Sequence, residues 1–113
     1  MQTVDENWLF IRGGLHDAFV VSICADTGHL DIRLNDEWAN ERGLSKPEHE
    51  EEPIILRFFS ASVRSGEWSH AVGGRVSEIV RIAGGDFSLI FQDRNALLIR
   101  AASVAALKLE FGS

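Results

Sequence analysis

The sequence predicts a mainly β fold: an antiparallel sandwich or partly open barrel of seven to eight strands, with one short helix. The first observation is that short apolar runs alternate with polar residues at a period of two. The second is that glycine pairs and aspartate-containing turns separate these runs at hairpin spacing. The third is the length of 113 residues, of which 45% are apolar and 25% charged. A chain of this size builds one hydrophobic core, so we expect a single domain over residues 1 to 113.

The clearest predicted element is a hairpin formed by residues 18 to 24 and residues 29 to 35. The intervening turn, Asp26-Thr27-Gly28, is typical of a tight connection between strands. A further strand is predicted over residues 7 to 12 (NWLFIR), because aromatic and β-branched residues there precede Gly13-Gly14. In the hairpin, alternation places one set of apolar residues on one face of each strand: Phe19, Val21 and Ile23, then Leu30, Ile32 and Leu34.

The second half of the chain contains one central strand and a predicted meander. Residues 54 to 60 are apolar on both faces apart from Arg57, so we place them mid-sheet and expect cover on two sides. Residues 61 to 74 show neither period and are expected to form a loop. The tail is interpreted as a strand, although its alanines also favour a helix. The remaining predicted strands are residues 75 to 82, 86 to 92, 96 to 100 and 101 to 111.

The alternating positions of these strands are expected to fill the interior. Phe87, Leu89 and Phe91 alternate in one predicted strand, and Ala105, Leu107, Leu109 and Phe111 alternate in the last. Removing one such side chain leaves a cavity as well as losing burial. We therefore expect Leu89→Ala or Phe58→Ala to lower the free energy of unfolding by about 2–5 kcal/mol.

Negative charge is concentrated in an insertion spanning residues 36 to 53. This segment carries seven acidic and two basic side chains, whereas the whole chain has a net charge of −6. Residues 36 to 43 are predicted to form the short helix, which Gly43 ends. The acidic balance and the scattered lysines and arginines exclude a nucleic-acid-binding surface. A field of one sign steers a basic protein partner, but such a segment is also typical of a solvated loop that maintains solubility.

Two tryptophans lie outside the predicted strands, one beside the acidic run and one in the sequence RSGEWSH. Large amphipathic rings in loops are frequent anchors of protein interfaces. Each ring could equally cover a small apolar cluster beneath its own loop. The expected partner-binding residues are Asp36, Glu37, Trp38, Glu48, Glu50, Glu51, Glu52 and Trp68.

No motif in the sequence indicates catalysis, a metal site or a cofactor. The histidines lack the spacings that bring two imidazoles onto one metal, and no phosphate-binding glycine loop or nucleophile signature is present. Cys24, the only cysteine, continues a strand and is expected to be a small buried apolar residue. No apolar run could cross a bilayer, and the N-terminus lacks a secretory signal, so we expect a cytoplasmic protein. The histidines are His16, His29, His49 and His70.

One stretch, LHDAFVVSI over residues 15 to 23, followed by the GHLDIRL strand, resembles small bacterial β-rich domains that include immunity proteins of polymorphic toxin systems. The resemblance extends through IILRFFSASV, IVRIAGGDFSLIF and LLIRAASVAALKLE. It implies a single cytoplasmic domain that neutralises a toxin by binding it, without a cofactor. His16 and Asp17 are the residues it would carry over, with a structural role.

Together these features predict a non-enzymatic protein-binding domain, a toxin-neutralising immunity protein in its specific form, with a basic protein partner. The alternative is a small-ligand-binding domain or small enzyme whose barrel mouth is lined by His16, His29 or His70. The chain is expected to be a monomer, or a homodimer formed through an exposed sheet edge.

Overall fold

A computed structural model of the chain describes residues 2–11, 13–16, 18–36, 52–66, 71–82, 85–93 and 95–108. Within these ranges, no helix is long and apolar enough to cross a membrane. The elements, in chain order, are β1 (Gln2–Thr3), α1 (Glu6–Ile11), the 3-10 turn η1 (Gly13–Leu15), β2 (Phe19–Asp26), β3 (His29–Asp36), β4 (Glu52–Phe59), β5 (Ser62–Ser65), β6 (Val76–Ile82), β7 (Asp86–Phe91), β8 (Ala96–Arg100) and β9 (Ser103–Lys108).

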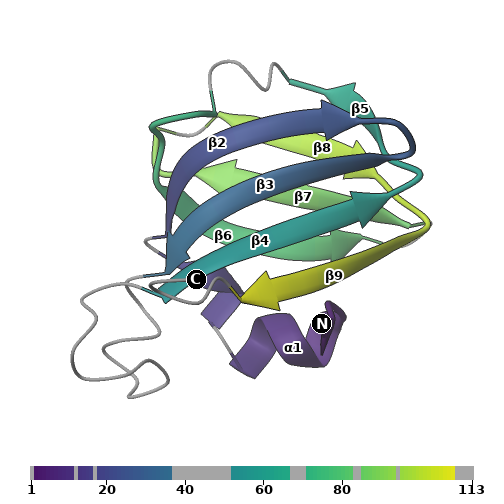
Figure 1. The fold of residues 1–113 in the computed structure, drawn as a ribbon. Helices are drawn as coiled ribbons and strands as arrows, with labels where there is room; N and C mark the ends of the chain where they lie inside the picture. The colour runs from purple at the N-terminus through teal and green to yellow at the C-terminus, as the bar shows by residue number, and fades with distance from the viewer. Residues whose placement is uncertain are drawn as a thin grey trace.

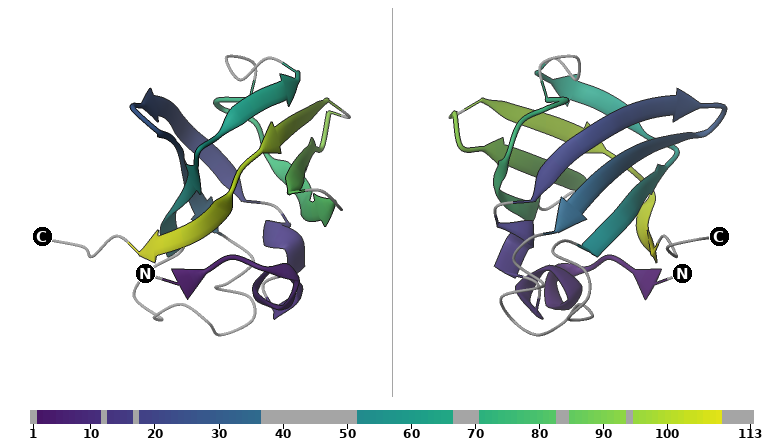
Figure 2. Two further views of the ribbon diagram at one scale, coloured as in Figure 1. Left: turned by 90° about the vertical axis from the view of Figure 1, so that its right-hand side faces the viewer. Right: turned by 60° about the vertical axis from the view of Figure 1, so that its left-hand side comes forward.

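The strands form two antiparallel sheets that face each other, as the sequence predicts for a sandwich (Figure 1). One sheet has the order β1-β9-β4-β3-β2 and the other β5-β8-β7-β6. Figure 2 shows the two sheets from the side, with β2 and β5 on one flank and α1 at one end. Within the described ranges there are eight strands besides the two-residue β1, which agrees with the predicted seven to eight.

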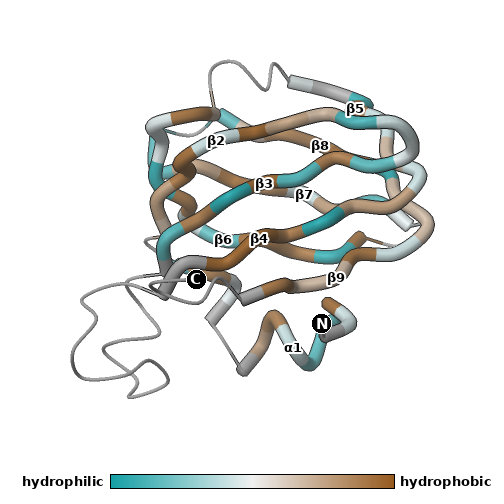
Figure 3. The backbone as a smooth tube through the Cα atoms, viewed as in Figure 1, coloured by the Kyte–Doolittle hydropathy of each residue, from teal (hydrophilic) through white to brown (hydrophobic). Residues whose placement is uncertain are grey.

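The core lies between the two sheets and is filled by alternate side chains of both. Figure 3 shows the alternation of apolar and polar residues along β3 and β4. Phe58 of β4 meets Phe87 of β7 edge to face, with ring centroids 5.7 Å apart. Phe58 and Leu89 are fully buried, as predicted from their alternation. These contacts join the sheets, because Phe58 and Phe87 belong to different layers.

Several predicted elements are confirmed. The hairpin is formed by β2 and β3, which pair up to Asp26 and His29 around the two-residue turn. The meander is formed by β6, β7 and β8, which are neighbours in one sheet. β4 lies at the centre of the five-stranded sheet, and the tail forms a strand over Ser103–Lys108.

The predicted strand over residues 7 to 12 is wrong, because Glu6–Ile11 forms the helix α1. Asp5 caps this helix: its carboxylate accepts a hydrogen bond from the Trp8 backbone N–H at 2.8 Å. Val4 and Leu9, which flank the cap, are both buried and fix the direction of entry. The cap and these two anchors override the strand propensity of the aromatic run.

The predicted inward face of β2 is confirmed at Ile23, which packs against the core, but it is wrong at Val21. The register of β2 against β3 shifts between Val20 and Ser22, which leaves Val21 as an extra residue in a β-bulge. Val20 is therefore fully buried, whereas Val21 is 36% exposed. Cys24, expected to be buried, is exposed on this strand. The period-two pattern of the sequence could not reveal the inserted residue.

Two expectations for the middle of the chain need correction. β4 is fully covered on one face, where Ile54, Leu56 and Phe58 are buried. The other face is only partly covered, and the Arg57 side chain there is 31% exposed. The predicted loop over residues 61 to 74 contains the strand β5, which pairs with β8. A four-residue edge strand is too short to show a period in the sequence.

The inward phase predicted for the last strand is wrong as well. Val104 and Ala106 pair with the buried Phe58 and Leu56 and lie on the inner face, whereas Leu107 is half-buried on the outer face. Alanines on both faces conceal this phase. Leu109 and Phe111 lie outside the described residues. The helix predicted over residues 36 to 43 is also outside them, except for Asp36, the last residue of β3.

Candidate interaction site

The acidic insertion leaves and re-enters the sheet at one place. Asp36 ends β3 and Glu52 begins β4, and the two residues are register partners. These are the two predicted site residues whose backbone the structure describes. The other six, Glu37, Trp38, Glu48, Glu50, Glu51 and Trp68, lie outside the described residues.

The helix α1 lies toward the same end of the sandwich as the junction of β3 and β4 (Figures 1 and 2). Its residues have three different environments. Leu9 is buried, Trp8 is half-buried against the core, and Phe10 is 82% exposed. Phe10 is the most exposed large apolar side chain in the part of the chain that the structure describes. An aromatic ring held open to water on a capped helix is a feature of binding surfaces.

A hollow of about 470 Å³ lies beside Phe10, between α1 and the strand β6. Leu9, Ile79 and Val80 give it apolar walls, while charged side chains lie around it. The hollow can therefore accept an apolar side chain of another molecule and offer polar contacts around it. It is lined by Glu6, Leu9, Phe10, Gly14, Glu78, Ile79, Val80 and Arg81.

The turn η1 fixes the wall of this hollow against β6. Gly14 has a φ of 67°, a left-handed conformation that glycine adopts without strain. Leu15 follows with a φ of 58° and is fully buried, so its burial holds the turn down. The Nδ1 atom of His16 lies 2.8 Å from the backbone oxygen of Ser77 on β6. His16 is thus used in tying the turn to the edge of β6.

A second polar group lies on the outer face of the five-stranded sheet. The guanidinium of Arg57 donates two hydrogen bonds of 2.9 Å to the two oxygens of Asp31 on the neighbouring strand. This hydrogen bonding lowers the pKa of Asp31 below its ordinary value, and burial opposes the effect. His29 Nε2 lies 3.9 Å from the same carboxylate. The ion pair of Asp31 and Arg57 joins β3 to β4. These side chains do not form the pair of acid and base that general acid–base catalysis needs.

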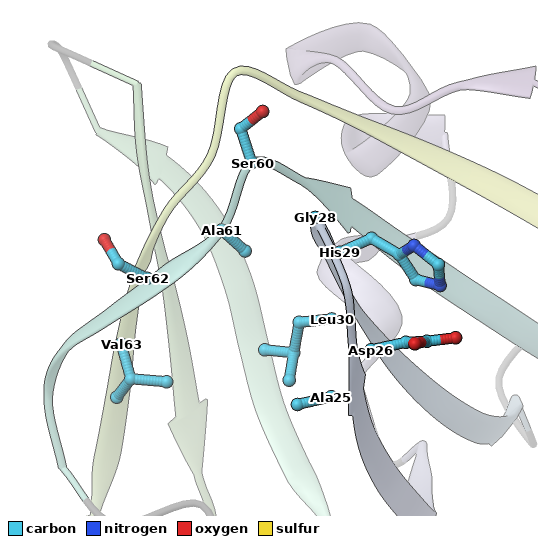
Figure 4. Close-up of a pocket in the computed structure, with 9 residues that line it drawn as sticks. All are labelled: Ala25, Asp26, Gly28, His29, Leu30, Ser60, Ala61, Ser62 and Val63. Carbon is cyan, nitrogen blue, oxygen red and sulfur yellow. The ribbon is translucent and has the colours of Figure 1, made fainter.

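A smaller hollow of about 270 Å³ lies at the opposite end, between the turn joining β2 to β3 and the strand β5. Leu30 and Ala25 point into it, toward Ala61 and Val63 (Figure 4). The side chain of His29 points away from it, on the other face of the hairpin. Its lining is therefore small and mainly apolar.

The histidines within the described ranges do not converge. His16 contacts Ser77 near the start of β6, and the adjacent Arg75 bridges to Phe19 at the start of β2. His29 lies beyond the far end of β2, eight strand residues away, or about 25 Å. His49 and His70 lie outside the described residues. Among the residues described, no three His, Cys, Asp or Glu side chains form a group that could hold a metal.

The prediction from sequence missed Phe10, because the run NWLFIR resembles a strand. The signal that could have identified the helix is Asp5 as its cap, with the acidic Glu6 in the first turn. The apolar residues Val4 and Leu9, on either side of the first turn, are the second signal. A helix starting there turns Phe10 away from Leu9. Comparison with protein families, with curated proteins and with solved structures found no match for this chain.

Proposed function

We propose that this chain is a non-enzymatic protein-binding domain. Its interaction surface would combine the acidic insertion, residues 36 to 53, with Phe10 and the hollow beside it. The observation that carries the proposal is the 82% exposed Phe10 ring next to a hollow of about 470 Å³. The insertion leaves the end of β3 and joins the start of β4, and this junction lies toward the same end of the sandwich as α1.

The charge of this surface favours a basic partner. The insertion carries a charge of −5 in the sequence, and the hollow adds Glu6 and Glu78 against Arg81. Negative charge raises the rate of encounter with a positive surface, while a buried aromatic ring slows dissociation. The specific form we propose is neutralisation of a basic toxin by binding. The resemblance of the sequence to immunity proteins supports this form.

The test uses the product of a toxin-like reading frame encoded beside this gene, purified as an inactive variant. Association and dissociation rates are measured by surface plasmon resonance at about 20 mM and 300 mM salt. Replacing Glu48, Glu50, Glu51 and Glu52 by glutamine should slow association about tenfold at low salt and reduce its salt dependence. Phe10→Ala should mainly accelerate dissociation, by about tenfold or more.

Two controls separate binding at this surface from general effects. Val63→Ala removes an exposed apolar side chain at the opposite end of the sandwich and should leave both rates unchanged. An unrelated basic protein should bind weakly and respond to the glutamine variant but not to Phe10→Ala. Unchanged rates for both the glutamine variant and Phe10→Ala would remove this surface from the interface and contradict the proposal.

A further inference from the structure

The strand β2 is an edge of the five-stranded sheet, and its two halves differ in their neighbours. At its start, the N–H of Val20 donates to the oxygen of Gly74 at 2.9 Å, and the N–H of Gly73 donates to the oxygen of Val20 at 2.8 Å. Phe19 also bridges to Arg75. In the part of the chain that the structure describes, no strand pairs with the outer side of residues 22 to 26. This outer half is defined here as the open edge.

The open edge lacks the features by which monomeric proteins protect such strands. Its sequence, SICAD, contains no proline and no lysine, and Asp26 is its only charged residue. The bulge at Val21 lies before it rather than within it. Unpaired edges with so few charged residues are templates for pairing with another strand.

The hairpin geometry shows which backbone groups are available. A two-residue turn makes the flanking pair, Asp26 and His29, a hydrogen-bonded pair of the ladder. Alternation then turns the N–H and C=O groups of Asp26 and Cys24 toward β3, and those of Ile23 and Ala25 outward. The outward bonds of Val20, beyond the one-residue bulge, agree with this phase.

We propose that the open edge pairs with the open edge of a second copy of this chain, antiparallel and about a two-fold axis at Cys24. In this register, Ile23 of each copy exchanges hydrogen bonds with the partner's Ala25. The two five-stranded sheets then become one continuous ten-stranded sheet. A two-fold interface uses the same residues on both subunits, so one unprotected edge is sufficient.

Electrostatic complementarity supports this register. The partner's Asp26 falls opposite Ser22, and Ser22 pairs with Arg33 of β3 on the same outer face. Arg33 is exposed, and the small Ser22 leaves its long side chain room to reach across one strand. The two-fold axis produces the attraction between Arg33 and the partner's Asp26 twice. At this edge negative side chains therefore face positive ones, although each chain has a net charge of −6.

The hollow in Figure 4 provides apolar contact for the same arrangement. Ala25 and Leu30 line it from one sheet and Val63, 40% exposed, from the other. Ile23 pairs with the buried Ile32, so its side chain lies on the inner face of the sheet. The partner's Ile23, placed beside Ala25, would extend toward the open rim of this hollow. Association would therefore cover apolar surface as well as unpaired backbone.

The experiment measures the association of the full chain by sedimentation velocity from about 1 μM to 1 mM. A single five-residue strand pair is smaller than a standard interface, so we expect a dissociation constant of about 10–100 μM. Ala25→Pro removes an outward N–H from each copy and should raise that constant about thirtyfold. Circular dichroism verifies that the variant is folded. A chain that remains monomeric at 1 mM would overturn the proposal, as would a dimer that Ala25→Pro does not weaken.

The register is tested by oxidation of the dimer with added copper(II) phenanthroline. The two Cys24 S–H bonds break, one S–S bond forms, two protons are released to solvent and two electrons pass to copper(II). Opposite residues of a non-hydrogen-bonded pair have Cα atoms about 4.5 Å apart, within disulfide range. Cys24 should therefore cross-link efficiently. The matched control, Ser22→Cys combined with Cys24→Ser, places its thiols about 13 Å apart along the strands and should not. Equal cross-linking of both proteins would overturn this register.

A charge exchange provides a readout that does not depend on proline. Asp26→Arg should weaken the dimer about tenfold, and Asp26→Arg combined with Arg33→Asp should restore it. Weakening without restoration would contradict the Asp26 to Arg33 contact. The open edge lies away from α1, toward the other end of the sandwich, so failure of this proposal and failure of the proposed function are distinguishable.

Discussion

The strands β6 and β2 are both sheet edges, but they are protected differently. The turn η1 lies against β6, where Gly14 approaches the backbone of Ile79 and His16 contacts the oxygen of Ser77. Of the residues that the structure describes before β6, Gly73, Gly74 and Arg75 lie against the start of β2. The turn that covers β6 depends on the left-handed backbone of Gly14 and Leu15 and on the burial of the Leu15 side chain. The open edge of β2 has no such requirement. The edge of β6 is therefore stabilised by contacts within the chain. The second half of β2 is the edge that we propose to associate with a second copy.

The largest expected effect is the loss of the anchor that holds η1 against β6. Leu15 is fully buried, and Leu15→Ala removes its packing and leaves a cavity. We expect the free energy of unfolding to fall by about 2–5 kcal/mol, as measured by urea denaturation. Ile23→Ala, at the half-buried side of the open edge, should cost only about 1 kcal/mol. Equal losses would show that the two edges do not differ as described.

A smaller effect is expected from two glycines that share a left-handed backbone. Gly14 has a φ of 67° beside β6, and Gly28 has a φ of 81° with open space around it. Replacement by alanine should cost about 1–2 kcal/mol at either position, because the β-carbon is disfavoured in this conformation. Hydrogen exchange should accelerate in β6 for Gly14→Ala only. Faster exchange in β6 for Gly28→Ala as well would contradict the local role of η1.

The next effect concerns the pair of Asp31 and Arg57 in the sheet that ends in the open edge. Asp31→Asn should lower the free energy of unfolding by about 0.5–1 kcal/mol at pH 7. The pKa of Asp31 is lowered in the folded state, so its contribution is complete above the ordinary value of 3.8 and is lost as pH falls through the folded pKa. The two proteins should therefore converge in stability once the pH has fallen below the folded-state pKa of Asp31. A difference that persists there would assign the effect to packing.

The smallest expected effect on stability is that of Phe10→Ala. Because the ring is 82% exposed, its removal should change the free energy of unfolding by less than about 0.5 kcal/mol. Urea midpoints for the parent and the variant should coincide. A marked loss of stability would show that Phe10 belongs to the cover of β6 rather than to a binding surface.

The sequence predicted the elements in which local signals agree. Gly28, with its positive φ, provides the tight turn of the first hairpin, and strict alternation identifies the inner face of β7. Prediction failed where one residue changes the phase or the type of an element. Val21 shifts the face of β2, and the cap at Asp5 converts an aromatic run into a helix. Neither effect is visible as a period.

Less of the candidate site could be predicted. The acidic insertion was identified from composition, but most of its residues lie outside those that the structure describes. Phe10 was missed because the run NWLFIR resembles a strand, and the exposure of its ring depends on which side of the helix packs against the sheets. Pairing of residues far apart in the chain, such as Phe19 with Arg75, covers the first half of β2, while no described residue pairs with the outer side of its second half. Such pairing is a property of the folded chain rather than of any segment.

The partnership of Asp36 and Glu52 has a consequence for how such a domain can change. A segment that departs from and returns to neighbouring positions can be lengthened, shortened or rewritten at little thermodynamic cost to the scaffold. Selection for a new binding partner would then change the residues of the insertion, while the strands β3 and β4 keep their register. The same junction would accept a foreign recognition peptide, which makes this sandwich a candidate framework for engineered binders.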